Sequence, residues 1–172
     1  MRSTIVCDTP VGPLYVLVDD AVVGVTAAGQ EAPWAVVGAA FGAAGESMPP
    51  VVPAATGVLA DVARAVAAWS AHGDDSLGSV PVSQPGGPFR QRVWQSLRSV
   101  PAGDVITYAA LAAVAGNPRA VRAAGTAMAT NAVAPFVPCH RVIRTGGQIG
   151  NYAYGVDSKR RLLVHEGAAG IH

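Results

Sequence analysis

The sequence has few cysteines and no long hydrophobic run. Its two cysteines, Cys7 and Cys139, are too few and too far apart to predict a disulfide framework, and no Cys and His cluster has the spacing of a zinc site. No apolar run approaches the roughly 20 residues that cross a bilayer. The first ten residues also lack the basic-then-apolar pattern of a signal peptide. We therefore expect a soluble, cytoplasmic protein with reduced thiols, no membrane segment and no bound metal.

Charged residues are also scarce, at 13% of the chain, and they are unevenly divided. Residues 1–87 carry two basic and eight acidic side chains, a net charge of −6, whereas residues 88–172 carry ten basic and three acidic side chains, a net charge of +7. A basic half of this size indicates a polyanionic partner such as nucleic acid, because Lys and Arg displace the counterions condensed on a phosphate backbone. Attraction between the two halves of the chain would explain the same charges.

The first half predicts a small antiparallel sheet covered by a helix. Three stretches within the first 30 residues, STIVCDTP, VGPLYVLVDD and AVVGVTAAG, are rich in Val, Ile or Leu and are separated by Gly, Pro or Asp. Residues 31–53 form a Gly-, Ala- and Pro-rich connector to which we assign no structure. Residues 54–72 then place apolar side chains on one helical face: Val58, Leu59, Val62, Val66 and Trp69. The double glycine at residues 86–87 indicates a domain boundary.

The second half predicts mainly helices. A helix beginning at Pro88 carries an apolar face, Phe89, Val93, Trp94, Leu97 and Val100, and an opposite face with Arg90, Arg92 and Arg98. Thr107 is expected to cap a short helix that ends at Gly116. Asn117 and Pro118 are expected to begin the next helix, which makes the pair a helix-turn-helix candidate. Asp157 is expected to cap a last helix with Leu162 and Leu163 facing inward.

These patterns together predict an α/β (α+β) fold with two domains. Residues 1–87 would form an N-terminal α/β domain with the connector. Residues 88–172 would form a mostly helical C-terminal domain, which is the candidate for DNA binding and for an active site.

The second helix of the helix-turn-helix candidate is poor in large side chains. Its small residues are Ala120, Ala123, Ala124, Gly125, Ala127 and Ala129. A recognition helix normally reads base edges with Asn, Gln or Arg, and this one offers little beyond Arg119 and Arg122. The helix either lies closely against a groove without reading sequence or packs closely in the core. The residue types alone leave both interpretations open.

Cys139 stands between Pro138 and His140 in the stretch FVPCHRVIRTGGQIGNY. A nucleophilic thiol must become a thiolate, which nearby positive charge or an adjacent base favours, and His140 and Arg141 follow directly. Neighbours in a regular strand point to opposite faces, so an irregular backbone or a bridging water is needed to bring His140 to the sulfur. A buried, inert cysteine is the alternative.

Glu166 stands at the end of the last predicted helix, just before Gly167. The helix dipole disfavours a carboxylate there. A carboxylate that orients an imidazole would account for this position, as in triads of nucleophile, base and orienting group. An exposed glutamate without a task is the alternative.

Residues 88–167 resemble the O6-alkylguanine-DNA alkyltransferase family. The resemblance is carried by PCHRVI, by the preceding stretch from FRQRVW to AMATN, and by the following GGQIGNYAYGVDSKRRLLVHEG. It implies that a damaged guanine is flipped out of the duplex and that Cys139 attacks the alkyl carbon on its O6. The alkyl group stays on the sulfur as a thioether, so each molecule acts once and needs no cofactor. The resemblance also implies that the helix-turn-helix binds the minor groove.

The same resemblance assigns roles to individual residues. It makes His140 the base through a water, Glu166 the residue that orients His140, and Tyr108 a proton donor to the departing guanine. Asn131 ties the helix-turn-helix to the active-site segment, and Arg122 enters the stack where the flipped base stood. The implied substrate pocket consists of Met128, Val142, Tyr152, Ala153 and Tyr154. The implied DNA contacts, besides Arg122, are Arg119, Ala120, Ala123 and Gly125.

Three residues depart from the usual family pattern. Ala132 replaces a common proline, so we expect a looser segment between Asn131 and Pro138. Ala153 replaces a frequent serine and lacks its hydrogen bond. Tyr154 replaces a common glycine, and we expect its bulk to narrow the pocket for large O6 substituents.

The expected partner is double-stranded DNA that contains alkylated guanine, bound by a protein that is monomeric in solution. Cooperative assembly on DNA and activity on O4-alkylthymine are left open. Two other hypotheses are a binder of alkylated guanine that performs no chemistry and a cysteine hydrolase that turns over with Cys139 and His140. The hydrolase would leave the helix-turn-helix and Arg122 without a role.

Overall fold

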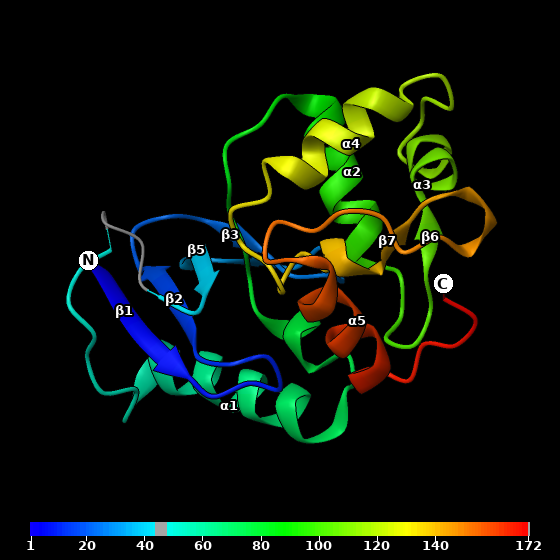
Figure 1. Ribbon diagram of the computed structural model, residues 1–172. Coiled ribbons are helices and arrows are strands. Elements are labelled where there is room, and N and C mark those ends of the chain that lie inside the picture. Colours follow the sequence, from blue (N-terminus) through cyan, green and yellow to red (C-terminus); the bar gives the residue numbers. More distant parts are fainter. Residues whose placement is uncertain (44–47, 172) are drawn as a thin grey trace. The chain divides into compact units, whose positions relative to one another are not determined.

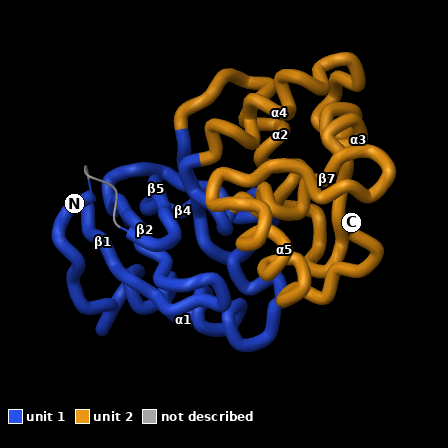
Figure 2. Tube along the Cα trace, viewed as in Figure 1, with its two compact units in different colours: residues 1–84, 132–136 blue, residues 85–131, 137–172 orange. Residues whose placement is uncertain are grey.

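The computed structural model describes residues 1–43 and 48–171 (Figure 1). The chain divides into two compact units, unit 1 with residues 1–84 and 132–136, and unit 2 with residues 85–131 and 137–172 (Figure 2). Local sequence patterns do not encode the return of residues 132–136 to unit 1. The division into functional domains 1–87 and 88–172 stays a prediction.

Unit 1 is built on an antiparallel sheet of order β1-β2-β5. Strand β1 (Arg2–Cys7) pairs with β2 (Leu14–Asp19), and β2 pairs on its other side with β5 (Ala35–Phe41). A short hairpin joins β3 (Gly24–Val25) to β4 (Glu31–Ala32). The buried sheet residues include Ile5, Leu14, Val16, Val18, Ala35 and Val36.

The third strand of this sheet was predicted in the wrong place. Residues 21–29 contribute only β3, whereas the connector 31–53 contains β4 and β5. The sequence of β5, AVVGAAF, is rich in Ala and Gly, which are uncommon in strands, so pairing with β2 decides its conformation. Residues 44–47 of the connector lie outside the described residues.

Helix α1 (Gly57–His72) packs against β1, which confirms the predicted covering helix (Figure 1). It buries Val62, Val66 and Trp69 at the predicted helical spacing. The helix ends where Gly73 adopts φ 64° and donates its N–H to Trp69 O, a left-handed conformation that favours glycine. A 3-10 turn, η1 (Ser76–Ser79), follows.

Unit 2 contains four α-helices: α2 (Pro88–Arg98), α3 (Tyr108–Val114), α4 (Val121–Ala129) and α5 (Val156–His165). A parallel pair of strands, β6 (Ile106–Thr107) and β7 (Val142–Ile143), and the 3-10 turns η2 (Cys139–Arg141) and η3 (Thr145–Gly147) complete it. The mixed α/β fold class with a helical second half is confirmed. Among the described residues, no helix has the length and apolar character to span a bilayer.

Helix α2 begins at Pro88 as predicted, whereas only one of the three predicted helix caps is correct. The Thr107 side chain accepts the Ala110 N–H at 3.1 Å, as expected of the cap of α3. Helix α4 begins only at Val121, because Asn117 Oδ1 accepts the Arg119 N–H and holds a turn before the helix. Helix α5 begins one residue before Asp157, which therefore lies in the first turn instead of capping it.

Helix α2 forms the core of unit 2. It buries Val93, Trp94 and Leu97 as predicted. Arg98, which was placed on the face opposite the apolar one, is buried, and burial lowers its pKa to about 10. Its position one residue after Leu97 places its aliphatic stem beside the apolar face.

Replacing Trp94 with alanine should lower the free energy of unfolding by about 3–5 kcal/mol, the usual cost of removing a large buried aromatic ring. Trp94 is 3% exposed, and its Nε1 donates to Ala127 O of α4 at 2.8 Å. Urea unfolding of the variant would measure the loss. Trp94→Phe keeps most of the ring and should lose about 1–2 kcal/mol with the hydrogen bond. Equal losses in both variants would contradict this account.

Candidate active site

Cys139 lies in an irregular segment of unit 2. Pro138, with φ −81° and ψ 65°, precedes the turn η2, and β7 follows it. Cys139, His140 and Arg141 are all buried. Successive side chains of a 3-10 turn project about a third of a turn apart, unlike those of a strand. The structure thus supplies the irregular backbone that the sequence required.

Asn131 holds the Cys139 sulfur from the end of α4. Its Nδ2 donates to Val137 O at 2.8 Å and to Cys139 Sγ at 3.2 Å. Burial raises the pKa of the Cys139 thiol, while the Asn131 hydrogen bond and the charge of Lys159 oppose this rise. The resting group is therefore a neutral thiol with a donor already in place for a developing thiolate.

His140 and Glu166 lie together in the interior of unit 2. His140 Nε2 is 3.0 Å from Glu166 Oε2, and the two side chains are 0% and 1% exposed. Burial opposes ionisation of Glu166, but the neighbouring His140 and Arg141 lower its pKa to about 2. Although Nε2 faces Glu166, neither ring nitrogen of His140 makes a hydrogen bond of good geometry among the described residues. The alternative of an exposed, idle Glu166 is wrong.

Two buried cations near this group were not predicted as site residues. Arg141 donates to both Glu166 oxygens, from Nε to Oε2 at 2.8 Å and from Nη2 to Oε1 at 3.0 Å. Lys159 donates from Nζ to Val142 O at 2.6 Å, and burial lowers its pKa to about 8. Lys159 precedes the inward-facing Leu162 by three residues, so helical spacing contained this signal.

Aromatic side chains surround the sulfur. Tyr108 opens α3, and its pKa is raised by burial and by the charge of Cys139. Burial and Cys139 likewise raise the pKa of Tyr152 well above its usual value. The Tyr152 ring meets the rings of His140 and Tyr154 edge-on, with centroids 6.5 Å and 5.6 Å away. The structure thus brings both Tyr108 and Tyr152 to Cys139.

Other predicted pocket residues differ in exposure. Val142 is buried in β7, directly after the turn that carries Cys139. Met128 and Tyr154 are half-buried, whereas Ala153 is exposed. The membership of these four residues in one substrate pocket stays a prediction.

The small residues of α4 serve two different purposes. Ala124 and Ala127 are fully buried, as expected of close packing in the core. Ala123 is exposed, and a Cβ added at Gly125 would meet no atom within 4 Å. Core packing is therefore confirmed for Ala124 and Ala127, and a groove-binding role of the exposed small residues stays a prediction.

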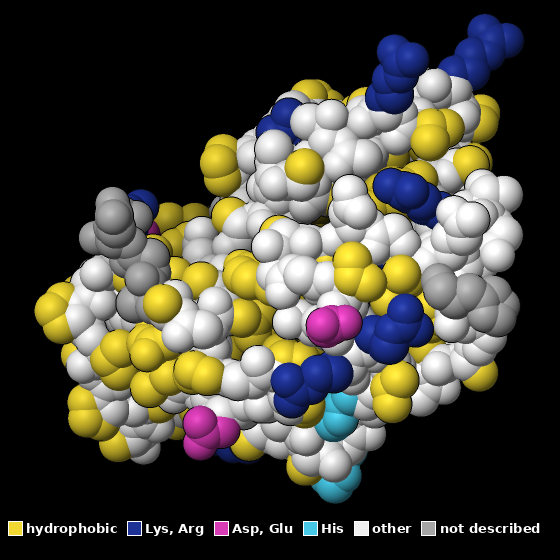
Figure 3. Space-filling view, viewed as in Figure 1, with side chains coloured by type: hydrophobic (Ala, Val, Ile, Leu, Met, Phe, Trp, Pro, Cys, Tyr) yellow, Lys and Arg dark blue, Asp and Glu magenta, His cyan; other side chains and the backbone are white. Residues whose placement is uncertain are grey.

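The exposed part of the helix-turn-helix is basic. Arg119 and Arg122 are both exposed, and Ala120 between them is half-buried. Lys and Arg side chains protrude from the α3–α4 end of unit 2 in the face shown in Figure 3. A basic surface with few bulky side chains suits close approach to a phosphate backbone.

Ala132 does not loosen its segment as predicted. Its N–H, which a proline would lack, donates to the buried Gln84 Oε1 at 2.8 Å. Its carbonyl accepts the Ala39 N–H at 2.8 Å. Both bonds lie within unit 1 and fix the chain directly after Asn131.

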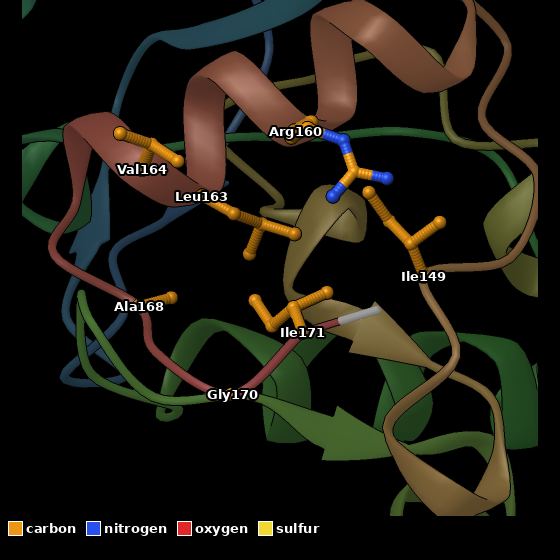
Figure 4. Close-up of a pocket in the computed structure, with 7 residues that line it drawn as sticks. All are labelled: Ile149, Arg160, Leu163, Val164, Ala168, Gly170 and Ile171. Carbon is orange, nitrogen blue, oxygen red and sulfur yellow. The ribbon is translucent and has the colours of Figure 1, made fainter.

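A separate cavity of about 140 Å³ lies between α5 and the C-terminal residues (Figure 4). It is lined by Ile149, Arg160, Leu163, Val164, Ala168, Gly170 and Ile171. Apart from Arg160 the lining is apolar and offers no nucleophile.

Residues 88–168 match the family described as 6-O-methylguanine DNA methyltransferase, DNA binding domain. Two curated relatives are methylated-DNA–protein-cysteine methyltransferases. The Homo sapiens protein is 49% identical over 87 residues, 51% of this chain and 42% of that protein. The Salmonella typhimurium protein is 50% identical over 82 residues, 48% of each chain. This region of the chain belongs to the 6-O-methylguanine DNA methyltransferase DNA-binding-domain family. The matched region spans about half or less of these relatives.

Solved structures extend the similarity to the whole chain. Mycobacterium tuberculosis O6-methylguanine methyltransferase is 27% identical with a TM-score of 0.72, covering 100% of this chain and 97% of that one. The same species' OGT in complex with DNA is 28% identical with a TM-score of 0.70, covering 96% of this chain and 92% of that one. The similarity in fold to these structures therefore includes unit 1 as well.

Proposed function

We propose that this chain repairs DNA by transferring the alkyl group of O6-alkylguanine irreversibly to Cys139. The observation that carries the proposal is the buried group of Cys139, His140 and Glu166, with Asn131 donating to the sulfur. Relatives named methylated-DNA–protein-cysteine methyltransferase and a relative's structure in complex with DNA support it. The chain would act once per molecule and would need no cofactor.

The chemistry is a single displacement at carbon. Cys139 Sγ attacks the alkyl carbon, an S–C bond forms, and the bond from that carbon to guanine O6 breaks with its electron pair on the guanine. The thiol proton passes through a water to His140 Nδ1, while Glu166 faces Nε2. Tyr108 donates a proton toward the anionic guanine, which lowers the cost of its departure. O4-alkylthymine would be attacked in the same manner.

On the DNA side, α4 would enter the minor groove with its small residues Ala120, Ala123 and Gly125. The minor groove shows a degenerate pattern of base edges, so binding there suits a protein that must act in any sequence. Arg122 would fill the stack after the target base is flipped. Arg119 would bind phosphate. A monomer in solution and any cooperative assembly stay predictions.

Intact mass spectrometry after incubation with a duplex containing O6-methylguanine tests the proposal. We expect a stoichiometric gain of one methyl group, located on Cys139 by peptide mapping. Binding without a mass change would identify a binder that performs no chemistry. Demethylated DNA in excess of protein, with no mass change, would identify a hydrolase. Either result rejects the proposal.

Tyr154 should restrict the size of the alkyl group. It is half-buried and packs edge-on against Tyr152, so its ring occupies space beside the proposed pocket. Single-turnover rates should be higher with O6-methylguanine than with O6-benzylguanine in duplex DNA. Tyr154→Gly should raise the benzyl rate relative to the methyl rate, whereas the neighbouring Ala153→Ser should not. A wild-type protein that reacts faster with the benzyl substrate would contradict this prediction.

A further inference from the structure

Glu166 is shared between His140 and Arg141. Its Oε2 lies 2.8 Å from Arg141 Nε and 3.0 Å from His140 Nε2, and its Oε1 accepts Arg141 Nη2 at 3.0 Å. Arg141 also donates from Nη1 to Val100 O, which fixes its guanidinium plane. All three side chains are buried, so water screens their charges little.

A carboxylate beside a buried imidazole has two effects, one that helps the imidazole to act as a base and one that prevents it. It fixes the orientation of the ring, and it also favours the protonated imidazolium, which has no lone pair left to accept a proton. A base that receives the Cys139 proton must be neutral before the reaction. A second, permanent positive charge on the same carboxylate would preserve the first effect and cancel the second.

We propose that Arg141 is a positioning residue that keeps His140 unprotonated, so that Glu166 orients the imidazole without charging it. The inference rests on the proposed function for the role of His140 as the base of Cys139. The protonation state of His140 itself can be measured without DNA. Arginine suits this task because its guanidinium stays charged when buried and binds a carboxylate with two hydrogen bonds.

The charges around His140 agree with this role. Cys139 and Arg141 belong to its own turn, α5 contributes Lys159 and, at its end, Glu166, and the loop before α5 contributes the Tyr152 ring. Burial lowers the pKa of His140, Glu166 raises it, and Arg141 and Lys159 lower it further.

Arg141 and Lys159 do not contribute equally to keeping His140 unprotonated. Burial lowers the pKa of Lys159 to about 8, so its charge is lost at moderately alkaline pH. An arginine guanidinium, in contrast, is the least readily deprotonated of the cationic side chains. Without Arg141, a single anion and a single titrating cation would face His140.

The proton route follows from this arrangement. With Nε2 facing Glu166, a neutral His140 carries its hydrogen there and presents Nδ1 as the acceptor. As Sγ attacks, the proton leaves the thiol for Nδ1. The new imidazolium keeps Nε2 toward Glu166, while Arg141 on the same carboxylate limits how far its charge favours the protonated ring.

Nuclear magnetic resonance of the wild-type protein with labelled histidine gives the direct test. The signal of His140 is assigned among the four histidines by its loss in His140→Gln. We expect His140 to stay neutral well below its ordinary pKa of 6.5. Titration at or above 6.5 would overturn the proposal.

A pH profile of Cys139 alkylation by iodoacetamide, read by peptide mapping to separate Cys139 from Cys7, gives the second test. In Arg141→Gln the acid limb should move up by about one unit or more, which is a loss of about tenfold at pH values on that limb and is recovered at alkaline pH. Arg141→Lys, which keeps the charge, should shift the limb less. A purely structural role would lower the rate equally at every pH and would overturn the proposal.

These readouts separate the inference from the proposed function. If wild-type protein takes no methyl group from DNA, the proposed function fails, while the His140 titration and iodoacetamide profiles still decide the role of Arg141. If Arg141→Gln does not fold, the wild-type titration and Arg141→Lys decide it. Because lysine keeps the positive charge, an acid limb of Arg141→Lys that lies one unit or more above the wild-type limb would overturn the proposal.

Discussion

Cys139→Ala is expected to abolish methyl transfer from O6-methylguanine while DNA binding is retained. The variant removes the sulfur that accepts the Asn131 hydrogen bond and whose pKa the charge of Lys159 lowers. The other cysteine, Cys7, belongs to β1 of unit 1, and burial together with Asp8 raises the pKa of its thiol to about 11. The thiol of Cys139 is protonated at rest as well, but it has the Asn131 hydrogen bond and the neighbouring His140 that favour its thiolate during attack, so we expect no transfer to Cys7.

Intact mass measures the transfer, and fluorescence anisotropy with a labelled duplex measures the binding. Cys7→Ala is the matched control, because it removes the other thiol and should transfer normally. Cys139→Ser should also be inactive, since its hydroxyl does not ionise at neutral pH. Methyl transfer by Cys139→Ala, or a methyl group found on Cys7, would contradict the assignment of the nucleophile.

The second large effect is expected from Arg122→Ala. Loss of the side chain that fills the stack should lower the single-turnover rate on duplex DNA by about 10–100-fold, because flipping costs a few kcal/mol. The rate with free O6-benzylguanine, which needs no flipping, should hardly change. Stopped reactions at saturating duplex followed by intact mass would measure both rates.

Arg119→Ala is the matched control for Arg122→Ala. Both residues are exposed cations of the helix-turn-helix, so each variant should reduce the log–log salt dependence of binding by about 0.9. Only Arg122→Ala should lower the rate once the DNA is saturating. Equal rate losses in the two variants would show that Arg122 contributes charge and nothing more.

Strong local patterns explain which elements could be predicted. Helices α1 and α2 have clear apolar faces, and Thr107 has the position of a capping residue. Strand β5 was missed because its Ala and Gly residues carry little strand preference, and only pairing with β2 forms it. The start of α4 was misplaced because Asn117 has two competing uses, as a helix cap or in a turn, and the turn prevails.

The candidate site divides in the same way. Cys139 and His140 are neighbours in the chain, and the family resemblance indicated Asn131 and Glu166 as their partners. The Arg141–Glu166 pair joins residues 25 positions apart, and no local pattern encodes that contact. Lys159 was overlooked because lysine is rarely fully buried, although its helical position pointed inward.

The amide group of Asn131 links the end of α4 to the sulfur of Cys139. Asn131 stands just beyond α4, and its two hydrogen bonds end on Val137 O and on the sulfur itself. Under the proposed function, the surface that meets DNA and the atom that reacts are separated by one side chain. Alkylation turns the sulfur into a poorer acceptor and crowds this amide. By thermodynamic reciprocity, a bound duplex and the chemical state of Cys139 must then bias one another, so that a spent molecule and a fresh one hold DNA with different strength.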